Sequence, residues 1–282
     1  MGKIDRKNVI ISIILIVVPL IFSLLYFVYT NFVGKDAFFS IYPKELSLIS
    51  CFSFWWFLIR FDIYSYYAYL LPLIITYLGC YSFFQVYHSG FVTYCSQRTN
   101  YTKFMKGMVL KSWKKSLLLP ILFGTFFLIS YLIFPNCNVI NSNNFDHLLY
   151  PFQTGHQYMT ILNPYLFVIL YLIMIFLYGI FIINLGMIIC KFVKKFSLFV
   201  IANYVAFMAL ENIFNFFVAP IFKALTNNEK MLNGFSILNL YYLDGIPSLI
   251  WEFCWVIFLI IITTFIISRL YCNRENVLND YE

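Results

Sequence analysis

QVYHSGFVTYCSQRTNYTKFMKGMVLKSWKK, residues 85–115, is the one long hydrophilic interval between two strongly apolar segments that also has a helical pattern. It carries six of the 19 basic residues of the chain and no acidic residue. At 100° per residue, four of its lysines fall within about 140° of one another, which predicts a single basic helix face. These lysines are Lys103, Lys106, Lys111 and Lys114. Such a helix either lies on an anionic membrane surface or docks to a partner protein.

The composition around this stretch excludes a soluble globular protein. The chain is 62% hydrophobic and 22% aromatic, and only 11% of its residues are charged, whereas soluble domains have about 25% charged residues. We therefore expect an all-α polytopic membrane protein. The net charge of +7 comes from lysines and arginines beside apolar segments. It is a signal of membrane topology and does not indicate a nucleic-acid partner.

Six apolar segments are long enough to cross the hydrocarbon core of about 30 Å. They predict one membrane domain over residues 1–282, with spans at about 9–30, 63–84, 116–134, 164–190, 197–219 and 248–267. A further apolar run at 46–59 would reach only about 21 Å as a helix. Trp55 and Trp56 in this run favour an interfacial helix, but a re-entrant segment or a seventh span stays open.

The distribution of basic residues predicts the orientation. With six spans and a cytoplasmic N-terminus, 14 basic residues lie inside and five outside. Seven spans with the reverse N-terminus give 13 against six, so the positive-inside rule alone does not fix the count. Both schemes place residues 85–115 and the basic turn at 191–195 in the cytoplasm. The length of the apolar segments favours six spans, which puts both termini in the cytoplasm.

The fifth span carries an acid. Glu211 follows fifteen uncharged residues, and Pro220 and a polar stretch come after it. We expect the helix to break at Pro220 and to continue as a re-entrant outer segment before span six. Glu211 has two candidate roles: it caps that re-entrant turn, or together with Asn215 it lines a gate and meets a cationic cargo.

Tyrosines gather in the second span, and four of them are spaced to share one side of its helix: Tyr66, Tyr69, Tyr77 and Tyr81. Aromatic residues are enriched where membrane proteins meet the lipid headgroups. These tyrosines therefore form part of a lipid-interface belt, or they line an aromatic path for an amphiphilic cargo.

The chain lacks the sequence motifs of the common catalytic sites. It contains no phosphate-binding GxxxxGK[ST] loop, no HExxH and no GxSxG, and its three histidines lie far apart. We expect a protein that is not an enzyme, that binds no metal and that holds no cofactor of its own.

The order of these features resembles the membrane subunit of an ABC-2 type transporter. A short N-terminal tail precedes span one, a basic helix joins spans two and three, and a broken fifth span precedes span six. Arg98, Tyr101 and Lys106 follow the loose pattern R-x2-Y-x4-K. In that family the helix between spans two and three docks into a separate ATPase subunit. The residues that the resemblance assigns to this contact are Gln97, Arg98, Tyr101, Lys103 and Lys106. The family helix usually begins with an acidic residue, whereas this chain has Tyr-His-Ser-Gly at 87–90, so the basic face must carry the contact.

The resemblance also implies partners and a cargo. The ATPase subunit would bind ATP and Mg²⁺, and a second permease subunit, identical or different, would complete the transporter in the bacterial plasma membrane. Family members of this size export antimicrobial or toxin peptides, some of them for self-immunity. A membrane immunity or sensor protein that does not transport is the alternative. A secondary transporter is a weaker one, because the chain shows no repeated halves.

Overall fold

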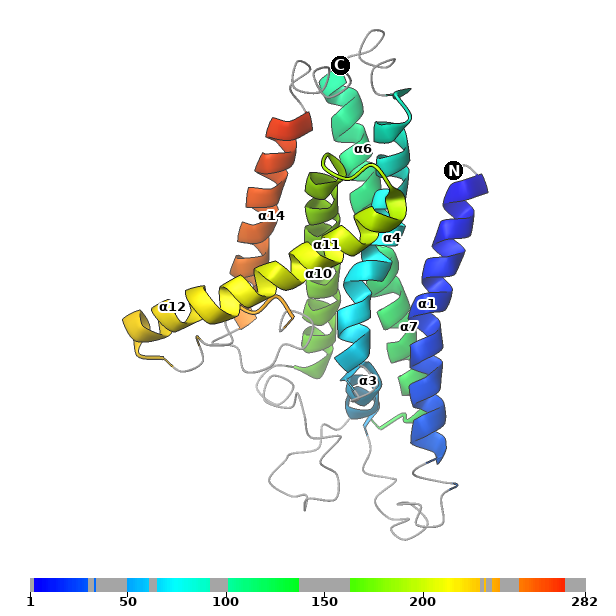
Figure 1. Ribbon diagram of the computed structural model, residues 1–282. Coiled ribbons are helices and arrows are strands. Elements are labelled where there is room, and N and C mark those ends of the chain that lie inside the picture. Colours follow the sequence, from blue (N-terminus) through cyan, green and yellow to red (C-terminus); the bar gives the residue numbers. More distant parts are fainter. Residues whose placement is uncertain are drawn as a thin grey trace. The chain divides into compact units, whose positions relative to one another are not determined.

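The computed structural model describes residues 3–29, 33, 50–60, 65–91, 101–136, 163–228, 231, 235–238 and 249–271. These residues are almost entirely helical and include no strand, which confirms the predicted all-α class. In chain order the helices are α1 (Lys3–Val28), α3 (Cys51–Arg60), α4 (Ser65–His88), α6 (Tyr101–Lys115), α7 (Leu118–Ile133), α10 (Pro164–Cys190), α11 (Phe196–Ile213), the π-helix η6 (Phe214–Val218), α12 (Ala219–Thr226) and α14 (Leu249–Tyr271) (Figure 1).

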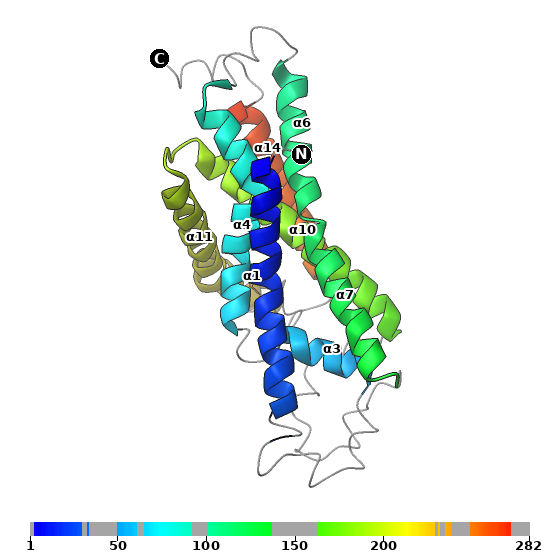
Figure 2. The same ribbon diagram turned by 90° about the vertical axis from the view of Figure 1, so that its right-hand side faces the viewer.

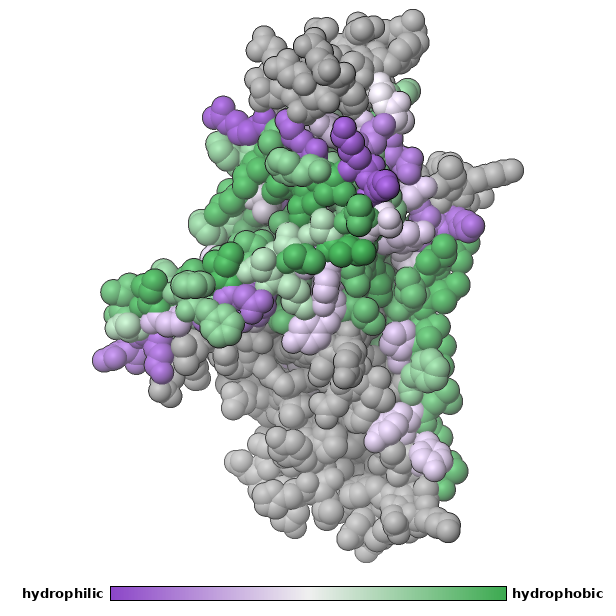
Figure 3. Space-filling view, viewed as in Figure 1, coloured by the Kyte–Doolittle hydropathy of each residue, from purple (hydrophilic) through white to green (hydrophobic). Residues whose placement is uncertain are grey.

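Six helical stretches in the described part of the chain are long and apolar enough to cross a membrane. They are Lys7–Tyr26, Tyr69–His88, Tyr101–Ile133, Pro164–Cys190, Phe196–Thr226 and Ile250–Tyr271. The number agrees with the six predicted spans. Apolar side chains also cover exposed helix surfaces, and Figure 3 shows them along the visible face of α11. These helices are those of a multi-pass membrane protein.

The chain divides into two compact units. Unit 1 combines Met1–Ser12, Tyr69–Leu119 and Met174–Glu282, and it contains α6, α11, η6, α12 and α14. Unit 2 combines Ile13–Ala68 and Pro120–Ile173, and it contains α3 and most of α7.

Aromatic residues form the core of unit 2 around α3. The Trp55 indole donates a hydrogen bond of 3.1 Å to the Phe123 carbonyl, and its ring lies edge-on to Tyr171 at 5.4 Å. Trp56 packs edge-on against Phe167 at 5.2 Å. The two tryptophans are 0% and 2% exposed, so their rings lie inside the unit and not against lipid. Ten residues of helix reach about 15 Å, which is too short for the seventh-span alternative.

Close contact between α4 and α10 builds the core of unit 1. A Cβ atom at Gly186 of α10 would lie 2.7 Å from Cys80 Sγ of α4, so only glycine allows the two backbones to approach this closely. Asn203 of α11 joins the contact, because its amide lies 2.5 Å from Thr76 Oγ1 of α4. Helices from three parts of the sequence therefore share one polar contact in an otherwise apolar core.

The prediction that the fifth span breaks at Pro220 is wrong. The helical stretch runs without interruption over Phe196–Thr226. Five residues before α12 form the π-helix η6, and Pro220 occupies the first turn of α12. A π-helical turn changes the register of the hydrogen bonds, and the first turn of a helix does not need the N–H that proline lacks. Asn227, in the left-handed conformation with φ of 53°, ends the stretch instead.

Helix α6 leads directly into α7. Only Ser116 and Leu117 separate the two helices, and the junction has hydrogen bonds three residues apart, from Ser116 N to Trp113 O at 2.9 Å and from Leu119 N to Ser116 O at 3.1 Å. Such short 3₁₀ turns connect helices without an open loop. The helical stretch that contains the predicted third span therefore begins at Tyr101 and not near residue 116.

Candidate functional site

Three buried side chains and two hydrogen bonds hold α6 in unit 1. Tyr101, Met105 and Ser112 are buried. Near the end of the helix, the Trp113 indole donates a hydrogen bond of 2.7 Å to Asn184 Oδ1 of α10. The Lys115 amine donates one of 2.8 Å to Ser82 Oγ of α4. Helix α6 is therefore fixed to two other helices through specific polar contacts.

Asn184 extends this connection to a third helix. Its amide nitrogen lies 3.1 Å from both Thr263 Oγ1 and Thr264 Oγ1 of α14. Asn184 is fully buried, and its oxygen and its nitrogen both have partners, so the network leaves no unpaired amide group. A displacement of α6 would have to break these bonds or move α10 and α14 with it.

The opposite side of α6 is basic and exposed. Its exposed lysines are Lys103, Lys106, Lys111 and Lys114. At 100° per residue they centre about 180° from the stripe of buried residues. The sequence thus predicted correctly that these four lysines share one side of the helix.

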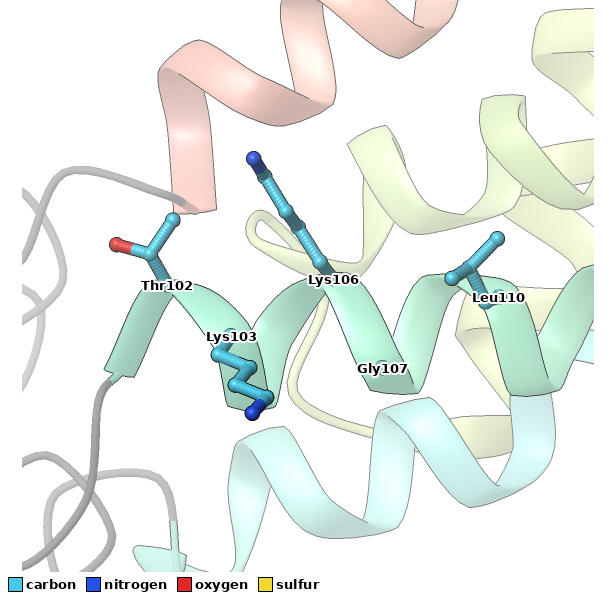
Figure 4. Close-up of a pocket in the computed structure, with 5 residues that line it drawn as sticks. All are labelled: Thr102, Lys103, Lys106, Gly107 and Leu110. Atoms are coloured by element: carbon cyan, nitrogen blue, oxygen red, sulfur yellow. The ribbon is translucent and has the colours of Figure 1, made fainter.

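A hollow of about 670 Å³ lies along this face, lined by Thr102, Lys103, Lys106, Gly107 and Leu110. Figure 4 shows the lysine side chains leaving the helix in different directions around Gly107. A Cβ atom at Gly107 would meet no atom within 4 Å, and the φ angle of Gly107 is not positive. Glycine in a helix is less favourable than alanine by about 0.5–1 kcal/mol. Neither the packing of the described residues nor the backbone conformation therefore requires glycine at this position.

The residues expected at this contact divide into three groups. Gln97 and Arg98 lie outside the described residues. Tyr101 is only 6% exposed, so it anchors the helix to the unit. Lys103 and Lys106 are exposed and line the hollow.

The second candidate site surrounds Glu211, which is 6% exposed. One carboxylate oxygen accepts hydrogen bonds from Ser236 Oγ at 2.5 Å and from Asn215 Nδ2 at 2.7 Å. The other accepts from the backbone N–H groups of Ile237 at 2.5 Å and Leu238 at 3.2 Å. Residues 235–238, here named the return segment, are thereby attached to α11. Four donors satisfy the charge of a buried carboxylate, and this favours the capping role for Glu211 over the gate.

The neighbouring amides behave differently from one another. Of the three asparagines near Glu211 in the sequence, only Asn215 bonds to it. The Asn212 amide donates to Met208 O of its own helix, and Asn203 faces α4. The re-entrant outer segment predicted after this span lies largely outside the described residues, apart from the return segment.

The tyrosines of α4 contact other helices of unit 1. The Tyr77 hydroxyl donates a hydrogen bond of 2.9 Å to Asn8 Oδ1. Asn8 belongs to the first turns of α1, the helix labelled in Figure 2. The rings of Tyr77 and Tyr81 both lie against Phe196 of α11, at 5.9 and 4.9 Å. Tyr69 is 40% exposed, and the Tyr66 side chain lies outside the described residues. The aromatic side predicted for this helix thus includes a helix-packing contact at Tyr77 and Tyr81.

Sequence reasoning missed Asn184 and the return segment. A lone asparagine in the apolar run of residues 164–190 is a signal of a buried polar contact, because an unpaired amide in such a run is costly. The return segment carries no comparable signal, since it contributes mainly backbone N–H groups.

Comparison of the chain with protein-family models, with curated proteins and with solved structures finds no match.

Proposed function

We propose that the chain is the membrane-spanning permease subunit of an ABC-2 type exporter, and that α6 docks to a separate ATPase subunit in the cytoplasm. The observation that carries the proposal is the combination of a basic, hollowed outer face with an anchored inner face on this one helix. An ATPase can drive a permease only through contacts that differ between its states. A helix attached to α4, α10 and α14 can pass such a displacement on as a rigid body.

The exposed face of α6 indicates which chemical groups the partner surface must carry. Four exposed lysines require an acidic counterpart, and the hollow at Gly107 accepts one protruding side chain of the partner. ATP and Mg²⁺ belong to that partner in this proposal. A second permease subunit completes the transporter in the bacterial plasma membrane, and both termini of this chain lie in the cytoplasm.

The proposed cargo is amphiphilic, such as an antimicrobial or toxin peptide, and its export would confer self-immunity on the cell. The abundance of aromatic residues supports this class, with 34 phenylalanines and 23 tyrosines in 282 residues. Aromatic side chains offer large apolar faces with a polar edge in tyrosine, which suits a peptide better than a strongly hydrated sugar polymer.

Charge reversal on α6 tests the proposal. The double variant K103E/K106E should insert and fold normally but should lose co-purification with candidate ATPase subunits and lose export. The matched control is K194E/K195E, which reverses two exposed lysines outside α6. Normal ATPase binding and export by the α6 variant would refute the docking role. Peptide binding without any ATPase partner would instead favour the non-transporting immunity or sensor protein.

A further inference from the structure

Glu252 is a buried acid that has no hydrogen-bond partner among the described residues. It lies in the first turn of α14 and is 0% exposed. Neither of its carboxyl oxygens has a hydrogen-bond partner in the described part of the chain. The buried indole nitrogen of Trp255, one turn further along α14, also lacks a partner there. Buried polar groups are normally hydrogen-bonded, so this pair of orphaned groups requires an explanation.

A second acidic residue, Glu211, influences Glu252. Glu211 of α11 interacts electrostatically with Glu252, and four donors bond to the two carboxylate oxygens of Glu211. The polar groups of the adjacent elements are neutral: Asn215 from η6, whose buried Oδ1 has no partner among the described residues, and Ser236 from the return segment. Glu211 is the charged group found to act on Glu252, so no described cation compensates a negative charge there.

Aromatic rings surround this part of unit 1. Trp255 lies 5.1 Å from Phe214 and 5.0 Å from Phe235, and Trp251 lies 5.4 Å from Phe235, all edge-on. Rings packed in this way exclude water. An ionised Glu252 would therefore be desolvated, unpaired and close to a second negative charge, and each of these conditions raises its free energy.

We propose that Glu252 is a reversible proton-binding site, which holds its proton while α14 is packed against α11 and the return segment. As a neutral acid, Glu252 avoids repulsion by Glu211 and carries an O–H group that can donate a hydrogen bond. A proton needs no cavity, and the described residues include no group of three or more ligands for a metal ion. Release of the proton to water leaves two neighbouring carboxylates, and their repulsion separates α14 from the return segment. This site does not depend on the proposed docking of α6.

Infrared spectroscopy of the full chain in lipid nanodiscs tests the site. At about pH 6.5 an ordinary glutamic acid is ionised, so a carboxylic-acid carbonyl band at this pH identifies a protonated buried acid. The band should be present in the wild type, absent in E252Q and retained in the neighbouring control C254S. If E252Q fails to fold, E252D keeps an acid on a shorter side chain and should shift the band.

Two results would overturn the proposal. The first is a spectrum without such a band, or with a band that neither Glu252 variant changes, because Glu252 would then be ionised in the folded protein. The second is stoichiometric binding of radioactive Na⁺ or Ca²⁺ that E252Q abolishes, because the ligand would then be a metal cation.

The predicted separation has its own readout in amide hydrogen exchange. Relative to their intrinsic exchange rates, the Ile237 and Leu238 amides should lose protection as the pH is raised in the wild type, and they should not do so in E252Q. Equal behaviour of both proteins would show that the proton does not control the return segment.

Discussion

Trp113 of α6 donates a 2.7 Å hydrogen bond to Asn184 of α10, although 71 residues separate them in the sequence. The bond joins a helix with an exposed basic face to a fully buried amide, and that amide in turn contacts two threonines of α14. Any force applied to the outer face of α6 therefore acts on the core of unit 1.

The first prediction concerns this bond. Replacing Trp113 by phenylalanine keeps a ring but leaves Asn184 Oδ1 buried without its donor, which should lower the free energy of unfolding by about 1–3 kcal/mol. Equilibrium unfolding in mixed micelles measures the change. The control K114A, at the exposed neighbouring position, should have little effect. If W113F is as stable as the wild type, the bond does not hold α6 in place.

The second prediction concerns Glu211. Leucine at this position keeps much of the bulk but offers no acceptor, so all four donors lose their partner. At about 1–3 kcal/mol for a buried unsatisfied group, E211L should raise amide exchange at both Ile237 and Leu238 by roughly 10- to 100-fold. The exposed neighbour Asn212 gives the control N212A, which should leave exchange unchanged. Unchanged exchange in E211L would show that Glu211 does not cap the return segment.

The third prediction contrasts two glycines. A Cβ atom at Gly179 of α10 would overlap Ser116 Oγ and lie 3.0 Å from Leu119 Cδ1, and Ser116 Oγ already donates a bond of 3.0 Å to Phe176 O. G179A should therefore destabilise unit 1 by about 1–3 kcal/mol. G107A meets no atom and should stabilise α6 by about 0.5–1 kcal/mol. Unfolding measurements on both variants check the pair, and equal effects would contradict the contact geometry.

The fourth prediction concerns topology. In a cysteine-free background, a cysteine at Asn143, in the loop between predicted spans three and four, should react with a membrane-impermeant reagent in intact cells. A cysteine at Lys103 should react only after the membrane is permeabilised. The charge distribution gives this result, because it places the basic stretches inside. The reverse labelling pattern would show that the protein has the opposite orientation in the membrane. Helix α6 could then not contact a cytoplasmic ATPase.

Local sequence patterns predicted the number of apolar helices and the basic face of α6. Apolar length alone gave the bounds of α10, residues 164–190, and helical periodicity gave the basic face of α6. The course of the chain at Pro220 could not be predicted in the same way. A proline favours a break, and no local motif in the sequence indicates the π-helical turn over Phe214–Val218 that precedes Pro220.

Long-range polar contacts could not be predicted from the sequence either. Glu211 was predicted to need partners, but three of its four donors lie 25 to 27 residues away, and two of these three are backbone N–H groups. Asn184 forms hydrogen bonds with Trp113 and Thr263, which lie even further away in the sequence, at 71 and 79 residues. No periodicity in one sequence identifies such pairs, because they depend on which helices pack together.

Photo-crosslinking from position 110 tests the docking of α6 most directly. A photoreactive amino acid in place of Leu110, which lines the hollow and is 52% exposed, should crosslink to the ATPase subunit in membranes that contain both proteins, because the partner would lie over the hollow. The same amino acid at Phe265, an exposed apolar position of α14 that is 59% exposed, should give lipid adducts. If position 110 also gives only lipid adducts while the ATPase is present, α6 lies on the membrane surface and the docking account is contradicted.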